Sequence, residues 1–194
     1  MPSLICLVLF AASLPDMLAE RLAPMASNRT VKAEYRQERE FKGLSMKLVV
    51  RGTMAYERGK GLVWSTSTPI ATKTVITSDS IVQWSAESGR AVKIDAESLP
   101  FIRPLFDCQN AWFGGDFTSI PGFRIESFSG RRLALSAVDG VAGSMFSRIE
   151  IDFSEDFTKV CRVRMAEKTG DEMVLMFDKT ANNVELPPST WECP

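Results

Sequence analysis

Residues 31–57 of the chain read VKAEYRQEREFKGLSMKLVVRGTMAYE, and they carry its clearest pattern of secondary structure. The first part of this stretch alternates apolar Val31, Ala33 and Tyr35 with charged residues, the period of two that is typical of a strand with one wet face. Its second part places apolar residues at positions 46, 48, 50, 54 and 56 on one face, with Gly52 as a candidate β-bulge or site of close backbone approach. The stretch therefore predicts two long neighbouring β-strands.

Short strands are predicted along most of the remaining chain, separated by Gly, Pro, Ser or Asp turn signals. The predicted strands are Leu62–Thr66, Thr72–Thr77, Ser80–Ser85, Ala91–Ile94, Phe123–Phe128, Arg132–Ala137, Ser147–Phe153, Val160–Met165, Met173–Phe177 and Val184–Leu186. About ten short strands favour an all-β sandwich or an up-and-down barrel, and the pattern alone does not decide between the two.

Two segments depart from this period of two. Leucines recur at helical spacing at positions 14, 18 and 22 and predict a short amphipathic helix over Pro15–Ala26. The segment Glu97–Trp112 is rich in large apolar side chains, but its prolines at 100 and 104 exclude a long regular helix. We expect that segment to form short helical turns packed on the sheet.

The N-terminal stretch predicts export. Residues 4–14 are apolar apart from Ser13, are too few to span a bilayer, and end in small residues, as in a secretory signal. We expect a signal peptide over residues 1–13 and a single domain over residues 14–194, with a buried N-terminal helix as the alternative. Export would leave Cys108, Cys161 and Cys193, and the sequence does not choose which two of them could form a disulfide.

Composition argues against several classes of function. The 194 residues include no histidine, which removes the side chain most used for acid–base catalysis and metal binding. Twenty-three Lys and Arg balance 24 Asp and Glu, so no overall field attracts nucleic acid. No CxxC motif or Cys/His cluster is present, so we expect neither a metal nor another cofactor.

Three stretches occur together in a recognisable order: AEYRQ at residues 33–37, RGTMAYER at 51–58, and GLVW at 61–64 followed by Pro69. In this order and spacing they resemble the LolA-like family of periplasmic outer-membrane lipoprotein carriers, and DSIVQW at 79–84 fits the next element of that pattern. The resemblance implies a mainly β fold, an incomplete and strongly curved antiparallel β-barrel with an N-terminal helix and a short helical lid. It also implies a monomer located in the periplasm.

The resemblance further implies that the barrel interior binds acyl chains. Candidate lining residues are Tyr35, Leu48, Val50, Met54, Trp64 and Trp84 from the sheet and Phe101, Leu105, Phe106 and Trp112 from the lid. Arg58 stands where lipoprotein carriers of the family have an arginine that bonds to the lid, which implies the same contact here. For each lining residue taken singly, ordinary core packing is the alternative, because small barrels fill with their own side chains.

Three functions remain open at this stage. The first is a carrier that takes acylated lipoprotein or lipid from an inner-membrane loading complex to an outer-membrane acceptor. The second is a lipid-sensing module of the same fold that signals to an envelope partner protein. The third is an enzyme acting on an envelope lipid or glycan, which the absence of histidine and of a Gly-x-Ser-x-Gly motif disfavours.

Overall fold

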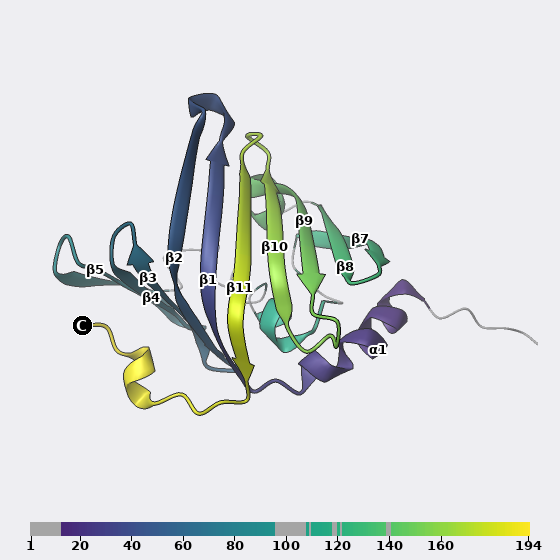
Figure 1. Cartoon of the computed structure of the whole chain (residues 1–194), viewed down its shortest axis with the longest axis horizontal. Helices are drawn as coiled ribbons and strands as arrows, with labels where there is room; N and C mark the ends of the chain where they lie inside the picture. The colour runs from purple at the N-terminus through teal and green to yellow at the C-terminus, as the bar shows by residue number, and fades with distance from the viewer. Residues whose placement is uncertain (1–12, 96–107, 109, 118–119, 121, 139–140) are drawn as a thin grey trace, which may run out of the picture.

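Eleven antiparallel strands form one continuous curved sheet (Figure 1). The computed structural model describes residues 13–95, 108, 110–117, 120, 122–138 and 141–194. The strands are β1 (Thr30–Phe41), β2 (Met46–Glu57), β3 (Gly61–Thr68), β4 (Thr72–Ile76), β5 (Ser80–Ser85), β6 (Arg90–Asp95), β7 (Phe123–Ser129), β8 (Arg132–Ala137), β9 (Phe146–Phe153), β10 (Val160–Glu167) and β11 (Glu172–Asn182). Their order across the sheet is β6-β5-β4-β3-β2-β1-β11-β10-β9-β8-β7.

This order joins two meanders at the centre of the sheet. Strands β1 to β6 run outward in sequence order, and β7 to β11 return so that β11 pairs with β1, with Tyr35 opposite Phe177. Within the described residues, β6 and β7 end the sheet and do not pair with each other, so the barrel is not closed. The predicted mainly β fold is confirmed. Of the two architectures that the sequence left open, the sheet forms a barrel, and this barrel is incomplete.

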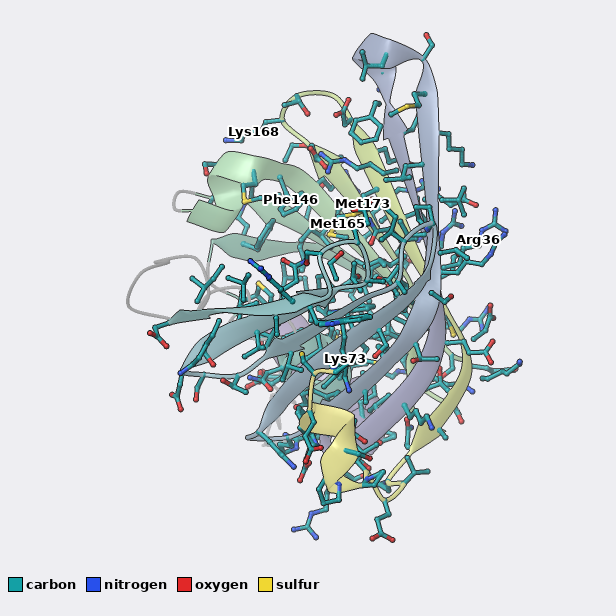
Figure 2. All side chains as sticks on the ribbon, turned by 90° about the vertical axis from the view of Figure 1, so that its left-hand side faces the viewer. Arg36, Lys73, Phe146, Met165, Lys168 and Met173 are labelled. Carbon is teal, nitrogen blue, oxygen red and sulfur yellow. The ribbon has the colours of Figure 1, made fainter. Side chains whose placement is uncertain are left out.

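The period of two in the first two strands separates the sheet into a concave and an outer face. Val31, Ala33 and Tyr35 are buried on the concave face, in the main core, while the alternate residues of β1 are exposed. Figure 2 shows Met165 and Met173 within the curve of the sheet and Arg36 on its opposite side. The concave face therefore carries the core, and the outer face carries most of the charge.

The N-terminal helix α1 (Leu14–Ala26) agrees with its prediction. Ser13 caps it in a capping box, because the Ser13 hydroxyl accepts from the backbone N–H of Asp16 and the Asp16 carboxylate accepts from the backbone N–H of Ser13. Leu18, Leu22 and Met25 are buried along one side of the helix. An amphipathic helix of 13 residues is marginal alone, so this buried stripe is what holds it in place.

Gly52 lies beside a bulge between β2 and β3, where the register shifts and Ser67 is the extra residue of β3. A Cβ atom at this position would lie 2.0 Å from the carbonyl oxygen of Ser65. Only glycine allows the two backbones to approach this closely, and the bulge increases the local twist that curves the sheet.

The predicted strand Val184–Leu186 is wrong. Asn183 adopts a left-handed conformation with φ of 56°, which ends β11 and turns the chain away from the sheet's hydrogen-bond ladder. The chain then continues over the outer face as an irregular segment and the short helix η3 (Pro188–Trp191). There Leu186 and Trp191 pack on a small apolar cluster formed by Ala55, Val63 and Val75.

Two further short helices are η1 (Lys42–Leu44), between β1 and β2, and α3 (Val141–Met145), before β9. Three predicted lid residues, Phe101, Leu105 and Phe106, lie outside the described residues, as do positions 1–12 of the predicted signal peptide. The cysteines Cys108, Cys161 and Cys193 form no disulfide with one another.

Candidate functional site

A groove of about 330 Å³ lies on the concave face and spans strands from both meanders. This volume falls within the range of about 300–1,000 Å³ that is usual for small-molecule sites. The lining residues are Tyr35, Gln37, Val50, Trp64, Thr66, Thr72, Thr74, Gln83, Met173 and Leu175. Strand pairing brings them together from β1 to β5 and β11, because neighbouring strands place residues of the same parity on the same face.

One wall of the groove is aromatic and aliphatic. The Tyr35 and Trp64 rings meet edge to face with centroids 4.7 Å apart, and Trp64 lies 6.2 Å from Phe177 behind it. Val50 and Met173 extend this wall along the concave face. Such a wall provides apolar contact area held in place by the ring packing beneath it.

The part of the groove formed by β4, β5 and Thr66 of β3 is polar and uncharged, and Gln37 of β1 places a further amide beside Val50 in the apolar part. Thr74 pairs with Trp64 on one side and Gln83 on the other, so a hydroxyl and an amide continue directly from the indole ring. The Tyr35 hydroxyl lies 2.7 Å from the Thr66 hydroxyl, and burial raises the pKa of Tyr35 above its ordinary value. Tyr35 therefore remains neutral over the physiological pH range.

A short helical stretch at residues 110–114 packs below the groove. Phe113 contacts Phe177 at 5.6 Å edge to face and Tyr56 at 5.6 Å, which continues the aromatic chain from Trp64 downward. Trp112 is buried here, and its indole N–H has no hydrogen-bond acceptor among the described residues. This stretch therefore packs in the core below the groove, and none of its residues lines the groove.

Arg58 ties this stretch to the N-terminal helix. Its Nη2 donates to the carbonyl oxygen of Gly114 at 3.1 Å and to that of Ala26 at 2.9 Å, and its Nε donates to the carbonyl of Asn28 at 3.0 Å. Each accepting carbonyl lies near the end of a helical segment, where the last carbonyls lack partners within the helix. A guanidinium at this place satisfies several of them at once and complements the negative end of each helix.

The structure brings only part of the predicted site together. Tyr35, Val50 and Trp64 line the groove. Met54 is 1% exposed inside the core, and Trp112 is 6% exposed, so both contribute packing. Leu48 has the parity of Val50 but is exposed, because the β1–β2 hairpin extends beyond the neighbouring strands (Figure 1).

The placement of Trp84 in the lining is wrong. Trp84 pairs with Lys73 on β4, and Lys73 lies on the outer face, where its Nζ donates to the carbonyls of Ser189 and Glu192 in the C-terminal segment. The adjacent residue, Gln83, is the one that faces the groove. The error arises because β5 is apolar on both faces, since Ile81, Val82 and Trp84 do not alternate cleanly.

Sequence reasoning also missed seven residues of the groove. These are Gln37, Thr66, Thr72, Thr74, Gln83, Met173 and Leu175. For Thr74 and Gln83 a signal existed, because correct hairpin registers place both directly beside Trp64. For Met173 and Leu175 no local signal existed, since the long-range β1–β11 pairing brings them to the site.

A second and larger hollow of about 690 Å³ lies on the outer face of β8 to β10. Among its charged residues, Arg132 bonds to both oxygens of Asp152 and Arg148 contacts Glu126 and Glu150, whereas the buried Nε of Arg162 has no hydrogen-bond partner among the described residues. Exposed pairs of this kind are typical of a solvated strand face.

Metal binding and membrane spanning each require a recognisable arrangement of residues. Across the parts of the chain that the structure describes, no group of three or more His, Cys, Asp or Glu side chains could hold a metal ion. No helix in those parts has both the length and the apolar character needed to cross a bilayer.

Comparison with known proteins gives fold neighbours only. No family model and no curated protein sequence matches the chain. An uncharacterized conserved protein from Thermus thermophilus is 11% identical, with 92% of this chain and 93% of that chain covered and a TM-score of 0.56. A chain of the Pseudomonas aeruginosa MucA/MucB complex is 14% identical, with 94% and 62% covered and a TM-score of 0.51.

A LolA superfamily protein from Nitrosomonas europaea also aligns, at 9% identity over 94% of this chain and 99% of that chain, with a TM-score of 0.49. Identities this low show a shared fold and nothing of activity. With the open eleven-stranded sheet, the two neighbours with TM-scores of 0.56 and 0.51 confirm that the chain shares their fold, and that fold is an incomplete antiparallel β-barrel.

Proposed function

We propose that the protein is a non-catalytic carrier that binds an acyl chain of a lipoprotein or another lipid in the concave groove. The observation that carries this proposal is the aromatic and aliphatic wall formed by Tyr35, Val50, Trp64 and Met173 around about 330 Å³ of open space. Carrying requires an enclosure and no nucleophile, base or metal, which suits a chain without histidine.

Burial of apolar surface supplies the binding energy for such a ligand. An acyl chain of about 16 carbons gains about 0.8 kcal/mol per methylene on leaving water, or about 12 kcal/mol before the costs of association. The groove buries only part of such a chain, so the affinity is moderate and the cargo can be released to an acceptor. A moderate affinity is what a shuttle requires, since a ligand held too tightly is not delivered.

The likeness of fold to LolA-like proteins supports a setting for this activity. On this proposal the protein works in the periplasm, takes cargo from an inner-membrane loading complex and passes it to an outer-membrane acceptor. The apolar stretch over residues 4–14 supports export to that compartment.

Two adjacent valines provide a matched test. Val49 and Val50 are both half-buried on β2, but Val50 lines the groove whereas Val49 faces outward opposite Glu38. Val50→Asn should weaken binding of a fluorescent fatty-acyl probe several-fold, because it places an amide where the chain would lie. Val49→Asn has the same cost in strand propensity and should bind the probe as the unmodified protein does.

The carrier proposal fails if the unmodified protein does not bind the probe. It also fails if both variants bind as well as the unmodified protein. Mass spectrometry of organic extracts from the purified protein would identify a cargo that remains bound through purification.

A second function, a lipid-sensing module that signals to a protein partner, is favoured by one observation. A chain of the Pseudomonas aeruginosa MucA/MucB complex shares the fold at a TM-score of 0.51, and that complex contains two proteins. A sensor would bind its partner protein differently with and without lipid, whereas a carrier would pass labelled lipid to acceptor vesicles. Transfer assays with defined vesicles separate the two.

A further inference from the structure

The concave groove has two chemically distinct walls, and this difference bears on which ligand fits. Trp64, Thr74 and Gln83 follow one another across β3, β4 and β5 on the same face, so the apolar wall passes directly into hydroxyl and amide groups. Thr66 and Thr72 pair with each other in the next row of that face. A groove for an acyl chain alone would gain more from apolar residues at these places.

Among the residues that the structure describes, no charged side chain lines this groove. Arg39 lies two residues after Gln37, on the same face of β1. Its guanidinium bonds to Glu167 at 2.9 Å and lies 4.7 Å from the centre of the Phe41 ring. Lys73 lies on the outer face and binds the C-terminal segment. Arg90, on the exposed edge strand β6, pairs with Ser85 and does not contribute to the lining.

We infer that the groove selects acyl ligands with an uncharged, oxygen-rich head, such as an acylated glycerol, over fatty acids and phosphate-bearing lipids of the same chain length. This inference rests on the proposed carrier function. The acyl chain lies on the wall of Tyr35, Val50 and Trp64, and the ester and hydroxyl groups of the head meet the polar wall.

The chemistry of the polar wall supports this choice. Threonine hydroxyls and the glutamine amide both donate and accept, so they match a head group whose hydroxyls also donate and whose ester carbonyls accept. A carboxylate or phosphate placed there would lose hydrating water without gaining a cation as partner. The free-energy cost of removing this water is far larger for a charged head than for a neutral one. The groove therefore discriminates mainly by rejecting charge.

The test compares ligands that share one acyl chain and differ only in the head. A monoacylglycerol, the fatty acid and the lysophosphatidic acid of equal chain length compete with a fluorescent fatty-acyl probe, at a pH where the carboxyl group is ionised. The monoacylglycerol should bind at least about tenfold more tightly than either anion. Its head group forms hydrogen bonds with the polar wall, whereas the charge of either anion has no cation to pair with, and the difference in binding free energy corresponds to this factor or more.

Variants assign the preference to the polar wall. Thr74→Val keeps the shape of the side chain and removes the hydroxyl, and Gln83→Met removes the amide. Each should weaken monoacylglycerol binding about three- to tenfold more than it weakens probe binding. Thr53→Val, on the exposed outer face of β2, is the matched control and should change neither.

The outcomes separate this inference from the carrier proposal. If no acyl ligand binds, the carrier function fails and the inference fails with it. If all three ligands bind equally, or if an anion binds most tightly, the carrier function stands and the inference is overturned. Loss of the preference in Thr74→Val with retained probe binding supports the inference.

Discussion

Arg58 provides a measurable link between the two helical segments beside the sheet. Its three hydrogen bonds to the carbonyls of Ala26, Asn28 and Gly114 measure 2.9–3.1 Å, and only the bond to Gly114 holds the stretch at residues 110–114 directly. A hydrogen bond from a charged donor contributes about 1.5–3 kcal/mol, and the lower value applies because the side chain is partly solvated. We therefore expect Arg58→Leu to lower the free energy of local opening of residues 110–114 by about 1.5 kcal/mol.

Hydrogen exchange measured by mass spectrometry tests this value. A change of about 1.5 kcal/mol corresponds to exchange about tenfold faster at the amides of residues 110–114, while peptides from β9 and β10 should be unaffected. Arg58→Lys should give an intermediate rate, because an ammonium keeps the charge but lacks the planar fork that reaches carbonyls in different directions.

Arg51→Leu is the control, as Arg51 lies on the outer face of β2 in an exposed position. The reasoning is refuted if exchange at residues 110–114 changes less than twofold in Arg58→Leu. It is refuted equally if Arg51→Leu accelerates exchange there to the same extent, because the effect would then come from lost charge rather than from the bonds to Gly114.

Two further predictions concern stability. Gly52→Ala should lower the melting temperature much more than Gly43→Ala does. A Cβ atom at position 52 would lie 2.0 Å from the carbonyl oxygen of Ser65, whereas Gly43 has open space around it. Equal shifts of the melting temperature in the two variants would contradict this steric role of Gly52. Hydrogen bonds from Ser154 and Thr158 lower the pKa of Asp156 from 3.8 to about 2, so its stabilising effect is complete above pH 4 and is lost as pH falls towards 2. Denaturant unfolding should accordingly find Asp156→Asn less stable than the unmodified protein at neutral pH and equal to it near pH 2, and a difference that persists at pH 2 would exclude this cause.

Much of the fold could be predicted from the sequence because its signals are local. The alternation in β1 and β2, the glycine beside the bulge and the helical spacing of leucines in α1 each act within a few residues. The segment Val184–Leu186 shows where such signals fail. Its apolar residues read as a strand, but the left-handed Asn183 directs them to the outer face, and a single left-handed residue leaves no mark on hydrophobic periodicity.

The candidate site was harder to predict than the fold because its residues meet through register. Tyr35, Val50 and Trp64 follow from parity along strands that each have one apolar face. Trp84 does not, because β5 is apolar on both faces and a shift of one residue reverses the assignment. The exposure of Leu48 depends on where the neighbouring strands end. The sequence of β2 alone does not contain this information.

The outer face of β2 to β4 carries an apolar cluster that is already covered, which indicates why the groove, and not this part of the outer face, remains open to a ligand. On the outer face, the cluster of Ala55, Val63 and Val75 is covered by Leu186 and Trp191. The cover is fixed by Lys73, whose Nζ bonds to Ser189 and Glu192, and by Lys60, whose Nζ lies 4.4 Å from the Trp191 ring. Since the chain's own C-terminal segment covers the outer cluster of Ala55, Val63 and Val75, a ligand can reach the strands that carry this cluster from the concave face, where Val50 and Trp64 line the groove.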